Sequence, residues 1–324
     1  MIEMDDFNTR GIPGIGVKRL ASFGLTTSGA DELSRFYEKA LGFRRLAAGR
    51  RSGSDFERLM GVESGAHSIT LSVGCEIVEL LQFDRPGNLY PAASASSDLC
   101  FQHFAIVVAD IQPAYQRLSS VGGWTAISIG GPQQLPASSG GVMAFKFRDP
   151  DGHPLELLAF PDGNLPKRWS NRSEGDLFLG IDHSAISVYD TGRSIAFYKA
   201  LGLHAAAHSL NVGPEQERLD AVSDVKVEVT GLEPQQATPH VELLCYRSVT
   251  HNRKVALRTN DVAATRLVFE ADRTSSDAVT TPQAFVDPDG HHLAIVAPIN
   301  PSSRTKAIAD SGSPPESVQL ESSR

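Results

Sequence analysis

Apolar and polar positions along the chain repeat in blocks that begin with a strand-like run and continue with a helical one. In the first block a strand pattern spans Val17–Thr27, and Ala30–Leu41 has apolar residues at helical spacing. Two further strand patterns follow at Ser68–Val73 and Glu76–Phe83, whereas the polar, arginine-rich residues 44–58 predict a loop. The block therefore predicts one strand, one helix and then further strands.

The same order of elements recurs three more times. The second block predicts strands at Phe101–Val108 and Trp124–Ile129, a helix at Ile111–Val121 and a hairpin over residues 141–160. The third predicts strands at Ile181–Val188, Val225–Val229 and Val241–Tyr246 and a helix at Gly192–Leu201. The fourth runs from Lys254 to Val296. Four blocks of one pattern indicate an internal repeat.

The repeat is also visible letter by letter. The helices contain FYEKALGF from Phe36 and FYKALGL from Phe197, and the turn Asp-Pro-Asp-Gly occurs at residues 149–152 and 287–290. The first strands align as SFGLTTSG from Ser22, HFAIVVAD from His103, HSAISVYD from His183 and KVALRTND from Lys254. The last strands align as ELL from Glu79, Glu156 and Glu242, and as AIV from Ala294.

Two positions of the repeat carry candidate chemistry, one on the first strand and one on the last. They hold Ser22 with Glu79, His103 with Glu156, His183 with Glu242, and Lys254 with Ala294. A single histidine or glutamate in a strand is usually a core or surface residue. Recurrence at equivalent positions instead favours a divalent metal site, because imidazole and carboxylate suit such ions. We expect His103, Glu156, His183 and Glu242 to be ligands.

Composition and charge narrow the functional class. The chain of 324 residues has a net charge of −8 and no long basic run, which argues against nucleic-acid and anionic-membrane partners. It has no apolar stretch of membrane-spanning length and an acidic N-terminus unlike a signal peptide. Its three separated cysteines favour a reducing compartment, so a cytoplasmic location is expected.

The helix ends, turns and His/Glu positions over residues 17–298 resemble the vicinal oxygen chelate superfamily, which includes glyoxalase I, methylmalonyl-CoA epimerase, extradiol dioxygenases and fosfomycin- or bleomycin-resistance proteins. The resemblance implies an α+β fold of four βαβββ modules, paired into two cup-shaped, barrel-like mixed sheets. It also implies that metal ligands come from the first and last strands of each module.

This organisation predicts boundaries along the chain. We expect an N-terminal arm (1–16), a first domain (17–160, modules 17–83 and 101–160), a linker (161–177), a second domain (178–298, modules 178–247 and 254–298) and a disordered tail (299–324).

Two pairings of the modules are open. If modules one and two share a cup, and three and four another, each cup has an incomplete ligand set. If two pairs with three, one cup holds His103, Glu156, His183 and Glu242. The cup of modules one and four then holds Ser22, Glu79, Lys254 and Ala294, where Lys254 could neutralise Glu79. The second scheme is favoured because it leaves no half-site.

Other polar residues have simpler readings. We expect His153, His291 and His292 to be turn or edge residues. His240 shares a strand face with Glu242, so it could line the cup, but exposure on the rim is favoured. Lys146 and Arg148 either hold an anionic substrate or are solvated.

The resemblance implies an enzyme with one divalent metal ion, Zn, Ni, Mn, Co or Fe(II), acting on a small oxygenated molecule. The first hypothesis is a glyoxalase- or epimerase-like lyase or isomerase in which Glu242 or Glu156 moves a proton next to a metal-bound carbonyl. The second is an extradiol-type dioxygenase with Fe(II), and the third a non-catalytic, resistance-type binding protein. A monomer or homodimer is expected.

Overall fold

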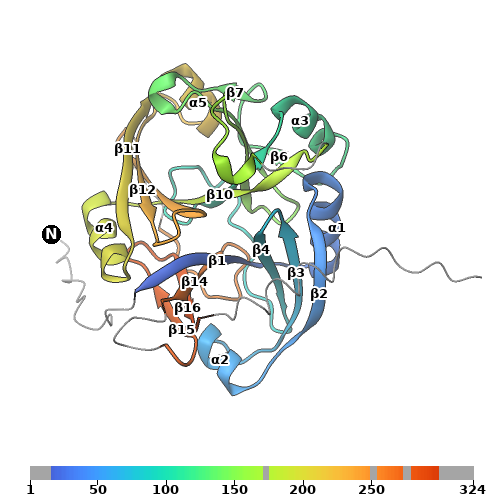
Figure 1. Ribbon diagram of the computed structural model, residues 1–324. Helices are drawn as coiled ribbons and strands as arrows, with labels where there is room; N and C mark the ends of the chain where they lie inside the picture. Colours follow the sequence, from blue (N-terminus) through green and yellow to red (C-terminus); the bar gives the residue numbers. More distant parts are fainter. Residues whose placement is uncertain (1–15, 171–174, 249–253, 273–278, 299–324) are drawn as a thin grey trace, which may run out of the picture.

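The computed structural model describes residues 16–170, 175–248, 254–272 and 279–298 (Figure 1). Most of the predicted N-terminal arm and the whole predicted tail, 299–324, lie outside the described residues. None of the described helices has the length and apolar character that crossing a bilayer requires.

Two mixed sheets form the framework. The seven-stranded sheet has the order β15-β16-β14-β1-β4-β3-β2, and the nine-stranded sheet the order β11-β12-β13-β10-β5-β9-β8-β6, with β7 paired to β8. The strands of the first are β1 (Val17–Thr26), β2 (Arg44–Arg51), β3 (Ala66–Val73), β4 (Glu76–Phe83), β14 (Arg266–Ala271), β15 (Gln283–Val286) and β16 (His292–Val296). Those of the second are β5 (Gln102–Val108), β6 (Thr125–Ala126), β7 (Gln133–Gln134), β8 (Met143–Arg148), β9 (Pro154–Ala159), β10 (Phe178–Ser187), β11 (His204–Val212), β12 (Lys226–Glu233) and β13 (His240–Tyr246).

The order of strands shows which modules share a sheet. β5 pairs antiparallel with β10, and β1 pairs antiparallel with β14. Module two therefore joins module three, and module one joins module four, which confirms the favoured pairing. The α+β fold class is confirmed as well, although each sheet is an open cup and not a closed barrel. The division of the chain into 17–160 and 178–298 stays a prediction, and both sheets are built across it.

Helices lie around the periphery of the two sheets (Figure 1). They are α1 (Ala30–Leu41), α2 (Ser54–Met60), α3 (Ile111–Ser119), α4 (Thr191–Ala200) and α5 (Pro214–Asp220). The α1 helix buries Leu33, Phe36 and Tyr37 on one face and ends at Gly42, whose φ of 69° is a left-handed conformation that glycine adopts readily. A hydrophobic core runs continuously between the sheets, where the rings of Phe23 and Phe104 lie 5.3 Å apart.

The first Asp-Pro-Asp-Gly turn fastens module two to module one. The hydroxyl of Tyr37 in α1 donates to Asp149 Oδ2 at 3.0 Å, and His153 Nδ1 lies 2.8 Å from the same oxygen. His153 Nε2 lies 3.0 Å from the carbonyl oxygens of Thr26 and Val262. His153 is thus a turn residue as predicted, but it is fully buried at the joint between the sheets.

The second turn repeats this arrangement between modules three and four. Tyr198 of α4 donates to Asp287 Oδ2 at 3.3 Å, and His291 Nε2 lies 2.9 Å from the carbonyl oxygen of Ser187. The FY pairs of the helices and the Asp-Pro-Asp-Gly turns therefore act together, because each buried tyrosine satisfies a turn aspartate of the following module.

The prediction of a loop over 44–58 is wrong, since this segment forms β2 and α2. The third module has the equivalent pair, β11 and α5, which the sequence also did not predict. Both strands are sheet edges with mostly exposed residues. Neither therefore has the alternation of apolar and polar residues that marks a strand with one buried face. The predicted strand Trp124–Ile129 is also shorter, since only Thr125–Ala126 is β6.

The fourth module departs most from the sequence repeat. The aligned run beginning at Lys254 is not a strand, and β14, beginning at Arg266, takes the place beside β1. No helix occurs in the parts of 254–298 that the structure describes. Lys254 is exposed, and its Nζ lies 3.4 Å from the carbonyl oxygen of Pro288.

Candidate metal centre

Modules two and three form a cup with a cavity of about 390 Å³. His103 on β5, Glu156 on β9, His183 on β10 and Glu242 on β13 line it, and we call it the histidine cup. Strand register makes its two halves equivalent. Across β5 and β10, His103 pairs with Ala185 and His183 pairs with Ala105. In turn, Ala105 pairs with Glu156 and Ala185 with Glu242.

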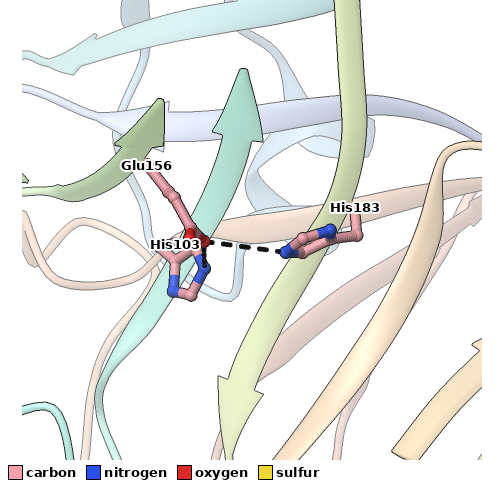
Figure 2. Close-up of side chains that lie close together, drawn as sticks. All are labelled: His103, Glu156 and His183. Atoms are coloured by element: carbon pink, nitrogen blue, oxygen red, sulfur yellow. Dashed lines mark hydrogen bonds and ion pairs between the residues drawn. The ribbon is translucent and has the colours of Figure 1, made fainter. Parts of the chain in front are cut away.

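Three of these side chains meet at one point. Figure 2 shows the carboxylate of Glu156 facing the imidazoles of both His103 and His183. Its Oε2 lies 2.8 Å from His103 Nε2 and 3.8 Å from His183 Nε2. One donor atom from each residue lies within 4.8 Å of the other two. The structure thus brings together residues from three strands that the sequence separates widely.

Glu242 lies beside this group, in contact with two histidines. Its Oε2 is 3.5 Å from His183 Nε2, and its Oε1 is 3.5 Å from His240 Nε2. The rings of His183 and His240 lie 5.4 Å apart. His240 is therefore half-buried against Glu242, and not an exposed rim residue as predicted.

Asp182 is a site residue that the sequence did not indicate. Its Oδ2 lies 3.0 Å from Nδ1 of His183. Neighbouring residues of a regular strand point to opposite faces, but the register of β10 shifts between Ile181 and His183. This irregularity lets Asp182 reach its neighbour, orient the imidazole and leave its Nε2 facing the cup.

Comparison with known proteins identifies the family. The family model described as Glyoxalase/Bleomycin resistance protein/Dioxygenase superfamily matches residues 19–157. Residues 19–157 belong to this superfamily. The predicted resemblance is thereby confirmed, and the matched range contains His103 and Glu156. No curated protein matches the sequence.

Solved structures extend the likeness in fold over most of the chain. Glyoxalase I from Zea mays is 17% identical with a TM-score of 0.54, covering 90% of this chain and 95% of its own. A variant of that enzyme is 18% identical with a TM-score of 0.55, covering 91% and 96%. A proposed dioxygenase from Bacillus subtilis is 11% identical with a TM-score of 0.51, covering 88% and 87%. At these identities the likeness establishes the fold.

One cation enters the histidine cup from β8. Lys146 pairs in register with Glu156, and its Nζ donates to Asp220 Oδ1 at 2.6 Å. Tyr246 and Gln216 also donate to Asp220, at 3.0 and 2.8 Å. Lys146 is thus held within the cup.

Arg148 does not reach this cavity. Its guanidinium donates to the carbonyl oxygens of Gly152 and Ser94 and lies over the ring of Tyr90. Of the two cations before the turn, only Lys146 is placed to act in the histidine cup.

The charges of the histidine cup keep both glutamates ionised. Burial raises the pKa of Glu242, but His183 and His240 outweigh it and lower this pKa to about 2. Burial also opposes ionisation of Glu156, yet Lys146 and His103 bring its pKa below the usual value. Both carboxylates can therefore serve as anionic ligands or as bases at neutral pH.

The two histidines differ in their protonation. Burial lowers the pKa of His183, but Glu242, Asp182 and Glu156 raise it to about 9. Burial holds the pKa of His103 below its usual value, and the cations of Lys146 and His183 add to this. In the metal-free protein a positively charged His183 thus neutralises the carboxylates around it.

The donor set fits a divalent transition metal. Ligands about 2.0–2.2 Å from one ion lie at most roughly 4.4 Å apart, and His103, Glu156 and His183 are near this limit. The Nδ1 atom of His103 has no hydrogen-bond partner among the described residues, whereas Asp182 supports that of His183. His183 would lose its proton to bind the ion, and the charge of the ion would then take the place of the charge on the imidazole.

The second cup, between modules one and four, holds different residues. Glu79 pairs with Gly24, and Ala294 pairs with Val268. These pairs are equivalent to the glutamate–alanine pairs of the histidine cup. The residues two positions earlier on the first strands are Ser22 and Arg266. The structure therefore corrects the assignment of Lys254, because Arg266 takes the position of the two histidines. We call this the arginine cup, and its cavity measures about 430 Å³.

Proposed function

We propose that the histidine cup binds one divalent metal ion and catalyses proton transfer next to a carbonyl of a small oxygenated substrate. The observation that carries the proposal is the convergence of two His/Glu pairs from equivalent strands of modules two and three. His103, Glu156 and His183 would hold the ion, with Glu242 beside them. When bound, such an ion polarises a carbonyl and acidifies the neighbouring C–H bond.

Glu242 is the proposed base. It lies outside the three donor atoms that come closest together, and its carboxylate is ionised at neutral pH. His240 and His183 hold its two oxygens in place. A ligand Glu that alternates between coordination and proton transfer also has precedent in the glyoxalase I resemblance. Glu156, bonded to His103, is the alternative base.

Lys146 is proposed to bind the oxygen on which negative charge develops. Asp220 occupies one of its three N–H donors, so others can face the substrate. Burial lowers the pKa of Lys146, but Asp220 and Glu156 raise it above the usual value overall. The side chain therefore stays protonated and stabilises negative charge by position rather than by giving up a proton.

Metal analysis tests the centre. We expect about one transition-metal ion per chain of purified protein, and a loss of tenfold or more in affinity in both His103→Ala and His183→Ala. His204→Ala is the matched control, because the His204 side chain is 61% exposed at the start of β11, lies near Glu233 and does not line the cavity. Unchanged metal content in His183→Ala would refute a centre shared by modules two and three.

A second function, ring cleavage by Fe(II), is favoured by one observation. The three closest donors are two histidines and one carboxylate, the set found in many non-haem iron oxygenases. The variant Glu242→Gln separates the two functions. If Glu242 is the base, turnover of a thiohemiacetal or 2-oxo substrate falls at least a hundredfold while metal is retained. Oxygen consumption with a catechol and Fe(II), unaffected by this variant, would instead identify a dioxygenase.

A protein that retains a small molecule but holds no metal and turns over neither substrate would be a resistance-type binding protein. Equilibrium dialysis of the metal-free chain with the same compounds provides this third outcome.

A further inference from the structure

The arginine cup has the shape of a binding site but not the donors of a metal site. Of its four equivalent positions, only Glu79 keeps a metal-ligand side chain, and the others are Ser22, Arg266 and Ala294. Its cavity of about 430 Å³ is similar in size to that of the histidine cup and within the range of small-molecule sites.

Arg266 is the central feature of this cup. Its side chain is only 4% exposed, and its Nη1 lies 2.9–3.2 Å from Thr26 Oγ1 and from the carbonyl oxygens of Thr259 and Ala264. No described residue accepts a hydrogen bond from its Nη2. Burial lowers the pKa of Arg266 to about 10, which still leaves it positively charged at neutral pH.

The strand opposite makes room for this guanidinium. Gly24 pairs with Arg266, and a Cβ at Gly24 would lie 3.2 Å from Nε and 3.4 Å from Nη2. The equivalent residue opposite His183 is Ala105, which has a side chain. The arginine cup is thus locally adapted to a larger cationic group.

The other charged residues in the cup already have partners. Arg19 lies 2.5 Å from Glu270, and Arg51 lies 2.8 Å from Glu79. Arg266 has no carboxylate within 4 Å among the residues that the structure describes. Glu79 attracts the Arg266 guanidinium only from a distance and is itself paired with Arg51, so one buried positive charge has no ion-pair partner of its own among the described residues. Such an arrangement is costly unless a counter-ion is supplied.

The rest of the lining is largely apolar. It includes Phe56 and Leu59 of α2, Ile77 and Leu81 of β4, and Val268 and Val296. A ligand that fits should therefore combine one negative group for the guanidinium with a small hydrocarbon body. Arginine is well suited to the negative group, because its fork of N–H donors matches a carboxylate.

We propose that the arginine cup is a second, metal-independent binding site for a small organic monocarboxylate, with Arg266 as its anchor. This site goes beyond the proposed function, which concerns only modules two and three. It gives one chain two related cups with different ligands, a metal ion in one and an organic anion in the other.

Calorimetric titration of the full chain with benzoate and hexanoate tests the proposal, with benzamide and hexanamide as uncharged matches. We expect both acids to bind at least tenfold more tightly than their amides, because a hydrogen-bonded charge pair is lost in the amides. Arg266→Met should remove this preference. Amides that bind as tightly as the acids would overturn the proposal.

Two substitutions at Ala294 test the charge without removing Arg266. Ala294→Glu places a carboxylate at the position that holds glutamate in the other modules, where it would neutralise Arg266 and compete with the ligand. Ala294→Gln has nearly the same shape without the charge. We expect benzoate affinity at least tenfold lower in Ala294→Glu than in Ala294→Gln, and equal affinities would contradict the assignment.

Carboxylates can also bind a metal ion, so benzoate binding at the histidine cup must be excluded. His103→Ala provides this control, since it changes the histidine cup and leaves the arginine cup intact. Benzoate binding that persists in His103→Ala supports the proposal, and binding that disappears with the metal overturns it. Circular dichroism spectra and melting temperatures identify the folded variants, and benzoate affinities are compared among these.

Discussion

The two cups share one frame of strands and differ in the residues placed on it. Both are made of two modules whose first strands run antiparallel and whose last strands run parallel to the first. At four equivalent positions, one cup has two histidines and two glutamates. The other has Ser22, Glu79, Arg266 and Ala294. The frame therefore does not depend on the ligands, and the chemistry of each cup rests on a few side chains.

The cups also balance charge in different ways. In the histidine cup a protonated His183 lies between two ionised glutamates, and Lys146 is paired with Asp220. In the arginine cup the glutamate position of module four is Ala294, so the cation of Arg266 has no carboxylate of its own among the described residues. This difference supports the two proposals, in which one cup exchanges a proton for a metal cation and the other accepts an anion.

Converting one cup into the other is the experiment with the largest expected effect. The triple variant Ser22→His, Arg266→His and Ala294→Glu, with Glu79 retained, recreates two His/Glu pairs. We expect a second metal ion per chain with a Kd near micromolar, which is about 8 kcal/mol of binding free energy. Metal analysis and competition with a chelator measure it.

The double variant Ser22→His and Arg266→His, without the second glutamate, is the matched control for the conversion and should bind the second ion more weakly. If the triple variant is folded and still holds one ion per chain, the cups differ in more than these four positions.

This correspondence between positions shows what the sequence could reveal. His103, His183, Glu156 and Glu242 were found as candidates because the letters around them recur, and the structure brings them into one cup. Arg266 was missed because the fourth module had lost that similarity. The run from Lys254 matched the pattern better than the true strand, and only the sheet register shows the equivalence.

Two other site features also depend on three-dimensional information. The contact of Asp182 with His183 requires a register shift in β10, which alternation of apolar residues does not signal. The pairing of Lys146 with Asp220 joins modules two and three across 74 positions of sequence. The exposed edge strands β2 and β11 escaped prediction because neither face is buried enough to leave a pattern.

The Lys146–Asp220 pair gives the next largest effect, because it is buried and only the histidine cup has it. Asp220→Ala would remove the acceptor shared by three donors, which are the Lys146 ammonium, the Tyr246 hydroxyl and the Gln216 amide. We expect a loss of about 3–5 kcal/mol in the free energy of unfolding. Chemical denaturation measures this loss.

Lys146→Met is the comparison for Asp220→Ala. It keeps the hydrogen bonds from Tyr246 and Gln216 to Asp220, so it should cost less. A loss below about 1 kcal/mol in Asp220→Ala would show that the pair is solvated and that Lys146 is not fixed for catalysis.

The cups should also give opposite responses to pH in the metal-free protein. Burial and nearby Arg266 lower the pKa of His292 to about 4, so the unfolded chain takes up a proton before the folded chain does. Its contribution to stability is present above pH 6.5 and is lost as the pH falls toward 4. His183, with a pKa raised to about 9, contributes stability below pH 6.5 that is lost as the pH rises through 9.

Each of these two contributions to the free energy of unfolding amounts to about 3 kcal/mol at the end of its range. Unfolding free energies at pH 4.5, 6.5 and 9 measure them. Relative to the native chain, His292→Gln should reduce the fall in unfolding free energy between pH 6.5 and 4.5. His183→Gln should reduce the fall between pH 6.5 and 9. Equal acid slopes in the native chain and in His292→Gln would mean that neither burial nor Arg266 lowers the pKa of His292.

The smallest expected effect concerns the ion pair at the mouth of the arginine cup. Arg51 is 55% exposed and Glu79 is 25% exposed, so water screens their attraction. Arg51→Ala should lower the free energy of unfolding, measured by chemical denaturation, by less than about 1 kcal/mol. Without Arg51, the carboxylate of Glu79 has no ion-pair partner. Glu79 lines the same cup as Arg266 and stabilises the charged form of the Arg266 guanidinium. Benzoate affinity should therefore fall modestly, about twofold to fivefold, because Glu79 becomes a competing anion. A rise in affinity would instead mean that Arg51 blocks the entrance, and that the charge balance of the two cups is set by Arg266 and Ala294 alone.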